Sequence, residues 1–138
     1  ARLLVDKSLH VLLVDDNAVN LLVARMMLKK CFPKANIVEA SSGPIALEKL
    51  NTTNFDLVLM DMVMPDMDGM QVTQQVRSRF PAMAARMPIF ALTANTNPVD
   101  RDRCLAAGMH DVLHKPMDMD TVKSMVGRYV RWARAGKL

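Results

Sequence analysis

The sequence predicts an α/β fold, a doubly wound parallel sheet of five strands with five helices around it. Short apolar runs such as 11–14 and 57–60 alternate with longer stretches of helical periodicity along the 138 residues. Uninterrupted apolar runs of this length are typical of strands buried on both faces, as in parallel sheets. Five strand–helix pairs in succession are typical of a doubly wound fold.

The expected elements follow one another without a linker or a repeat. We expect strands at 10–15, 36–40, 56–61, 88–93 and 111–115, and helices at 18–30, 43–51, 69–79, 98–107 and 119–134. Ser42 and Asn97 precede helices whose first residues include a proline, and both are good capping residues. Gly108 follows a helix, where a left-handed cap favours glycine.

Composition limits the class of protein. A chain of this length is expected to be one domain, and its 51% apolar and 23% charged residues are those of a globular protein. No window approaches the roughly 20 apolar residues of a membrane span, and the start lacks a signal-peptide core. Cys31 and Cys104 have no metal-ligand spacing, so we expect reduced thiols and a cytoplasmic location.

The net charge of +4 is unevenly distributed, because segment 123–138 carries five basic residues and no acid. A basic helix can contact nucleic acid, but this one lacks the clustered basic motif of nucleic-acid readers. We therefore expect a solvated helix face or a linker, and no direct binding of nucleic acid.

Reactive side chains stand where four of the predicted strands end. They are Asp15 and Asp16, Asp61, Thr93, and Lys115. Ligands of open parallel sheets bind beyond the carboxyl ends of the strands. We therefore expect three carboxylates, a hydroxyl and an ammonium to converge on one crevice.

This set of groups suits phosphoryl transfer onto an aspartate. Asp61 is the expected nucleophile, since a carboxylate can form an aspartyl phosphate. Asp15 and Asp16 would repel it unless a cation lay between them, and Mg²⁺ prefers such oxygen ligands, with a backbone carbonyl just after Asp61 completing the protein's share. Lys115, the Thr93 hydroxyl and the backbone N–H of Ala94 can all bind the phosphoryl oxygens.

The motifs resemble those of the receiver domains of two-component signalling, which are found in response regulators and hybrid sensor kinases. The matching segments are Val14-Asp15-Asp16-Asn17, 60–69 around Asp61, Ala91-Leu92-Thr93-Ala94, and Gly108-Met109 through Lys115-Pro116. The resemblance covers about 10–130. A pattern that extends to Asn20 is more like hybrid-kinase receivers than transcription factors.

The resemblance implies a flavodoxin-like sheet of order 2-1-3-4-5 and a fuller site. It assigns Mg²⁺ to Asp15, Asp16, Asp61 and the backbone carbonyl of Val63. It implies that Asp61 accepts phosphate from a phosphohistidine of a sensor kinase or phosphotransfer protein. We place the receiver domain at 9–135, between a linker at 1–8 and a tail at 136–138.

One position departs from the family pattern. Relatives usually carry an aromatic residue three positions before the lysine, where it rotates inward as the threonine moves. Here this switch position is Val112. Because valine cannot swing between buried and exposed poses, we expect Thr93 to move without an aromatic partner.

Two surfaces are candidates for partners. The first helix is apolar on more than one face, and we predict phosphohistidine docking at Ala18, Leu21, Leu22 and Arg25. A homodimer through the last two helices stays open. Methionines also crowd the end of the third strand, as core or as a partner-binding rim; they are Met60, Met62, Met64, Met67 and Met70.

Two other functions compete with the phosphoacceptor hypothesis. A phosphorylation-independent binding module is kept open by Val112. An aspartyl-phosphate hydrolase of the haloacid dehalogenase type would need a carboxylate two residues after the nucleophile, where this chain has Val63. We therefore expect no turnover of external substrates.

Overall fold

A single parallel sheet organises the molecule. The computed structural model describes residues 9–65, 67–84, 87–94, 97–115 and 117–134. Within them, five strands are ordered β2-β1-β3-β4-β5, and every neighbouring pair is parallel. The strands are β1 (His10–Val14), β2 (Asn36–Ala40), β3 (Leu57–Asp61), β4 (Ile89–Thr93) and β5 (Asp111–His114). The predicted fold class and strand order are confirmed.

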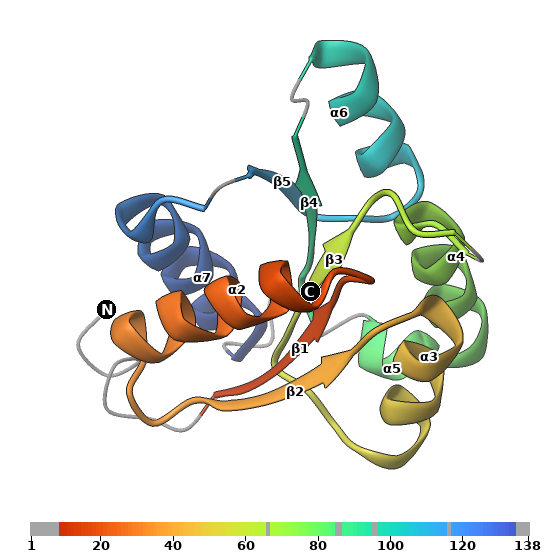
Figure 1. Ribbon diagram of the computed structural model, residues 1–138. Coiled ribbons are helices and arrows are strands. Elements are labelled where there is room, and N and C mark those ends of the chain that lie inside the picture. Colours follow the sequence, from red (N-terminus) through yellow and green to blue (C-terminus); the bar gives the residue numbers. More distant parts are fainter. Residues whose placement is uncertain (1–8, 66, 85–86, 95–96, 116, 135–138) are drawn as a thin grey trace.

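Helices cover both faces of the sheet (Figure 1). They are α2 (Ala18–Cys31), α3 (Gly43–Thr52), α4 (Gly69–Arg79), α5 (Pro81–Ala84), α6 (Pro98–Ala106) and α7 (Met119–Arg134). Helices α2 and α7 lie together on one face, while α3, α4 and α5 lie on the other. The sequence predicted five of these six; α5 has only four residues, too few to produce a helical period.

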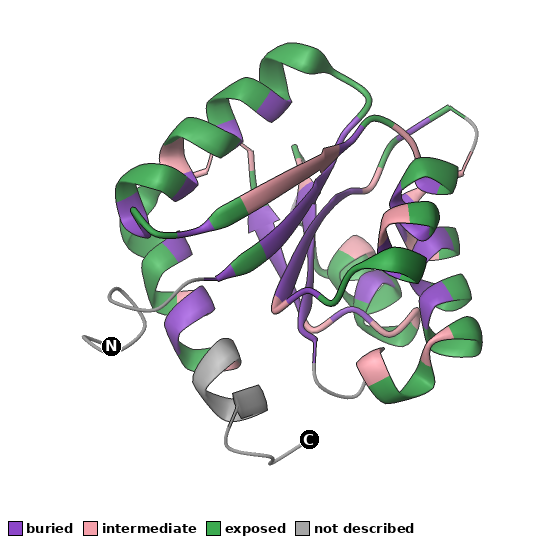
Figure 2. Cartoon of the chain, turned by 90° about the horizontal axis from the view of Figure 1, so that it is seen from below, coloured by how far each residue is buried: buried purple, intermediate pink, exposed green. Residues whose placement is uncertain are grey.

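Two hydrophobic cores result from the alternation of side chains along each strand. Leu12, Val58 and Met60 point to the core beneath α3 and α4. Leu13 and Leu59 point to the other core, beneath α2 and α7. The central strands are therefore buried on both sides, whereas β2 at the sheet edge is partly exposed (Figure 2).

Capping residues fix where the helices begin and end. The Ser42 and Asn97 side chains accept hydrogen bonds from backbone N–H groups of α3 and α6, as predicted. Asp68 and Gln71 form a capping box at the start of α4. Gly108 follows α6 with a φ of 108°, a conformation that side chains with a Cβ rarely adopt.

Other expectations concern the thiols and the ends of the chain. Cys31 and Cys104 are buried and free, and burial raises the pKa of both thiols. Among the described helices, none is long and apolar enough to cross a membrane. The predicted linker at 1–8 and tail at 136–138 lie outside the described residues, as does Pro116.

Candidate phosphoryl-transfer site

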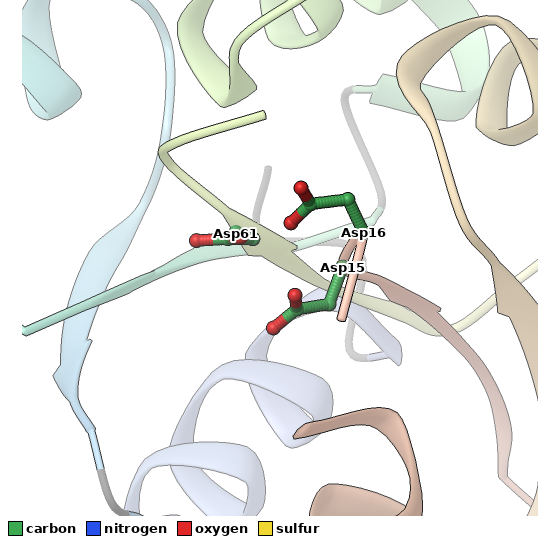
Figure 3. Close-up of side chains that lie close together, drawn as sticks. All are labelled: Asp15, Asp16 and Asp61. Atoms are coloured by element: carbon green, nitrogen blue, oxygen red, sulfur yellow. The ribbon is translucent and has the colours of Figure 1, made fainter. Parts of the chain in front are cut away.

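Three carboxylates meet at the carboxyl end of the sheet. Asp15 and Asp16 follow β1, and Asp61 is the last residue of the adjacent β3. Each of the three offers an oxygen, and these atoms all lie within 4.8 Å of one another. Figure 3 shows the three side chains extending to the same side of the strand ends. The predicted convergence of the acidic residues is therefore present in the structure.

Lys115 joins two of the carboxylates. It follows β5, and its Nζ donates hydrogen bonds to Asp15 Oδ2 at 3.2 Å and to Asp61 Oδ1 at 3.0 Å. Its backbone N–H donates to the Thr93 carbonyl oxygen at 2.8 Å, which holds the lysine beside the end of β4. The carboxylates are 3% and 5% exposed as residues, so water screens this ion pair weakly.

Backbone N–H groups hold the carboxylates in place. The N–H of Asn17 donates to Asp15 Oδ1 at 2.9 Å, and the N–H of Val63 donates to Asp61 Oδ1 at 3.3 Å. Asn17 also caps α2 through its side chain. This cap was not predicted, although an asparagine directly before a helical stretch is a recognisable capping signal.

The surroundings raise the pKa values of both Asp61 and Lys115. Burial raises the pKa of Asp61, and the Asp15 charge raises it further, while hydrogen bonds from Lys115 and Val63 partly oppose the shift. Burial acts on Lys115 in the opposite direction, but its bonds to Asp61 and Asp15 leave its pKa raised overall. Lys115 therefore stays charged at neutral pH, and an ionised Asp61 is costly without further positive charge.

The other residues predicted for the site come from β4, β5 and the loop after β3. Thr93 ends β4 and is half-buried, and the exposed Ala94 follows it. Val63 is 79% exposed on the loop after β3. Val112 lies on β5 and is buried, 8% exposed, so the predicted switch position holds a small side chain inside the protein.

The predicted docking surface on α2 needs one correction. Ala18, Leu22 and Arg25 are exposed, as expected, but Leu21 is only 8% exposed and packs into the core beneath α2 and α7. The reason is helical periodicity, because Leu21 shares the inward face with Ala24 and Leu28. The exposed apolar stripe instead consists of Val19, Leu22, Val23 and Met26, at 67%, 55%, 47% and 55% exposure.

A second polar cluster, which the sequence analysis missed, lies at the start of β5. The buried carboxylate of Asp111 accepts hydrogen bonds from Arg101 at 3.0 Å and from the Tyr129 hydroxyl at 3.2 Å. Arg128 stands 3.9 Å from the same carboxylate. A charged residue at the start of an apolar strand was the available signal. The cluster joins α6 and α7 to β5.

The acidic cluster offers the kind of ligands that a divalent cation binds. Three oxygen ligands within 4.8 Å of one another match the preference of Mg²⁺ for carboxylates. The pKa of Asp61 is raised by burial and by Asp15, so the cluster gains from added positive charge. Asp15, Asp16 and Asp61 are the side chains that could hold the ion.

Comparisons with known proteins agree with this geometry. The model of the response regulator receiver domain family matches residues 11–127. The chain is 37% identical to the aerobic respiration control sensor protein ArcB of Escherichia coli K12 over 122 residues, which are 88% of this chain and 15% of that protein. It is 38% identical to the transcription factor SKN7 of Saccharomyces cerevisiae over 125 residues, 91% of this chain and 19% of the relative. The chain thus spans less than a fifth of the length of either.

Solved structures add the same fold. The receiver domain of the sensor histidine kinase PA1611 from Pseudomonas aeruginosa, solved with a magnesium ion in its active-site cleft, has a TM-score of 0.79 and 33% identity, covering 91% of this chain and 99% of that one. The chemotaxis protein CheY4 of Vibrio cholerae has a TM-score of 0.77 and 27% identity, covering 89% and 99%. With the matched strand order and the family match across 11–127, this chain belongs to the receiver-domain family of two-component response regulators.

Proposed function

We propose that this receiver domain takes a phosphoryl group onto Asp61 from a phosphohistidine of a sensor kinase or a phosphotransfer protein. The observation that carries the proposal is the ion pair of Lys115 with Asp61 and Asp15, inside a cluster of three carboxylates. Such a site offers a nucleophile, a fixed positive charge and oxygen ligands for a cation, which are the parts that phosphoryl transfer needs.

The two carboxylate oxygens of Asp61 have different roles in the proposed reaction. Among the described residues, the hydrogen bonds to this carboxylate both end on Oδ1, so we assign the attack to Oδ2. As the bond from Oδ2 to phosphorus forms, the bond from phosphorus to the imidazole nitrogen breaks, and that nitrogen keeps the electron pair. Lys115 Nζ, the Thr93 hydroxyl and the Ala94 N–H would then hold the phosphoryl oxygens.

Mg²⁺ is part of the proposal. Asp15, Asp16, Asp61 and the backbone carbonyl of Val63 would hold the ion, and a bound Mg²⁺ neutralises charge on the transferring phosphoryl group. The similar receiver domain of PA1611 was solved with magnesium in its cleft, which supports the same ion here.

The exposed stripe on α2 is our candidate for docking the phosphohistidine protein. The stripe, defined above as Val19, Leu22, Val23 and Met26, adjoins a hollow that leads to the site. Val23 and Asn20 of α2 line this hollow together with Asp15 and Lys115. A helical partner seated on the stripe could therefore present its phosphohistidine at Asp61.

We place the receiver domain at 9–135, with 1–8 and 136–138 as flanks, and propose a cytoplasmic location because both thiols are free. A homodimer through the last two helices, α6 and α7, is also proposed, and its test is the sedimentation coefficient of the protein. We propose that the domain has no turnover on external substrates, since Val63 stands where a hydrolase would need a carboxylate.

The test of the proposed function is the intact mass after incubation with Mg²⁺ and acetyl phosphate. We expect the protein to gain one phosphoryl group, and we expect Asp61→Asn to gain none. Exposed Asp102 of α6 provides a matched control, because Asp102→Asn should be labelled like the unaltered protein. Labelling of Asp61→Asn would reject Asp61 as the acceptor. No labelling by either acetyl phosphate or a phosphohistidine protein would favour the binding module instead.

A further inference from the structure

A cleft of about 530 Å³ lies beside the phosphoryl-transfer site. We call it the Thr93–Val112 cleft. Its wall includes Met62, Met64, Met70, Thr93, Cys104 and Val112. A hollow of this volume is within the range that binds organic groups in proteins.

The cleft exists because two neighbouring elements fill little space there. Val112 is a small side chain on β5 that lines the cleft. Helix α6 contributes few side chains to the core, because Cys104 is its only buried residue. In Figure 1, α6 stands apart from α4, on the side of the sheet where β5 lies.

The chemistry of the wall favours an aromatic ring. Three methionines and a cysteine bring sulfur to the cleft, and the Cys104 Sγ lies 3.7 Å from the Met62 Sδ. Sulfur atoms make favourable contacts with aromatic rings, and methionine adapts to the shape of what it binds. Among the described residues that line the cleft, none is itself aromatic.

The rim of the cleft carries charges of both signs. Asp68, Asp100, Arg101 and Arg103 line it, and Arg103 stands 3.9 Å from Asp100. An apolar centre within a polar rim is the usual anatomy of a protein interface, and aromatic side chains are frequent anchors at such centres. These features favour a ring presented on a polypeptide, whose backbone can meet the polar rim.

The cleft also shares residues with the phosphoryl-transfer site. Val63 lines it and donates its backbone N–H to Asp61 Oδ1 at 3.3 Å. Thr93 lines it too, and its carbonyl oxygen receives the N–H of Lys115. A change at Asp61 that moves either residue alters the cleft wall, and by linkage a bound ring alters the site.

We propose that the Thr93–Val112 cleft binds an aromatic side chain of a partner protein, which occupies from outside the space left by Val112. The binding of an aromatic ring in the cleft does not depend on the proposed function. The coupling of ring binding to phosphorylation does rest on the proposed function. The partner would therefore read the state of Asp61 through the walls formed by Val63 and Thr93.

The first test uses N-acetyl-L-tryptophanamide as the probe and N-acetyl-L-leucinamide as the non-aromatic control. With ¹³C-labelled methionine methyl groups, the tryptophan probe should shift Met62, Met64 and Met70 saturably and leave Met26, exposed on α2, unchanged. We expect the leucine probe to bind about ten-fold more weakly, as the loss of one strong sulfur–aromatic contact predicts. Equal binding of the two probes, or equal shifts at Met26, would overturn the proposal.

Variants that fill the cleft provide the second test. Val112→Phe should abolish binding of the probe, while the matched Val99→Phe, on an exposed position of α6, should bind like the unaltered protein. If Val112→Phe does not fold, Met70→Trp fills the cleft from a half-exposed position. Unchanged probe binding in a folded cleft-filling variant would reject the cleft as the site.

The coupling is tested with Mg²⁺ and beryllofluoride, a phosphoryl mimic. We expect the affinity for the tryptophan probe to change when the mimic binds, which the amide signal of Val63 reports independently. Binding of the mimic without a change in probe affinity would overturn the coupling. A chain that binds the probe but never the mimic would instead overturn the proposed function and leave the aromatic site intact.

Discussion

All five residues of β3 are buried, whereas α6 buries only Cys104 among its nine residues. The first element carries Asp61 and lies at the centre of the sheet, between two cores. The second stands at the β5 side of the sheet and lines the Thr93–Val112 cleft. Reacting groups need fixed positions, so they belong on the densely packed strand. Parts that respond to a signal need low local stability, which light packing provides.

A matched pair of substitutions tests whether β3 and α6 differ in how much their packing stabilises the protein. Leu59→Ala on β3 should lower the free energy of unfolding by about 3 kcal/mol, because this fully buried residue leaves a cavity. Leu105→Ala on α6 should cost less than about 1 kcal/mol, because Leu105 is 39% exposed and alanine favours helices. Urea denaturation measures both. Equal losses would mean that α6 is packed as firmly as the sheet centre.

Magnesium should stabilise the protein through the carboxylates at the strand ends and not through α6. If the carboxylate cluster holds the ion, free Mg²⁺ at ten times its dissociation constant should raise the free energy of unfolding by about 1.4 kcal/mol. Asp16→Asn removes one predicted ligand and should weaken this effect, and Asp102→Asn on exposed α6 should retain it. Thermal unfolding with and without Mg²⁺ is the measurement. Equal magnesium effects in both variants would contradict the assignment of the ion to the cluster.

The fold could be predicted almost completely from the sequence, and particular residues explain why. Strands such as Leu57–Asp61 are buried on both faces and therefore appear as continuous apolar runs. Asn97 and Ser42 mark helix starts because their side chains must accept backbone N–H groups there. The order β2-β1-β3-β4-β5 came from the family resemblance, since periodicity does not determine which strands are neighbours.

The candidate site was predictable only in part. Strand ends placed Asp15, Asp61 and Lys115 in one crevice, but the lysine's bonds to both carboxylates depend on side-chain geometry. Leu21 was assigned to the outer face of α2 because that helix is apolar on several faces, and only packing shows which face is inward. The partners of Asp111 come from two other elements, α6 and α7, so no local pattern could reveal them.

Removing the charge of Asp61 should stabilise the metal-free protein. Burial and Asp15 raise the pKa of Asp61 above its ordinary value, so the folded state binds this proton more tightly than the unfolded chain does. Stability from this residue is therefore lost as the pH rises through its folded pKa. At neutral pH, Asp61→Asn should melt at a higher temperature without Mg²⁺ and gain less than the unaltered protein when Mg²⁺ is added. A lower melting temperature would show that the bond from Lys115 outweighs the cost of burial.

The smallest expected effect concerns His110, which joins the α6 side of the molecule to the sheet. Its Nδ1 accepts the N–H of Ile89 at 3.0 Å, and burial, with a contribution from Arg77, lowers its pKa below the ordinary value near 6.5. The unfolded chain therefore takes up this proton first as the pH falls. Stability is complete above about pH 6.5 and is lost as the pH falls through the folded pKa.

His110→Asn tests this pH dependence, because its amide oxygen can replace Nδ1 as the acceptor and does not titrate. We expect the fall in melting temperature between about pH 7.5 and 5.5 to be smaller in this variant than in the unaltered protein. His114→Asn, at the exposed end of β5, is the matched control and should keep the full fall. If both variants retain it, protonation of His110 does not limit acid stability. The acid sensitivity must then come from groups other than His110, and Asp61 is not one of them, because its raised pKa makes protonation favour the folded state.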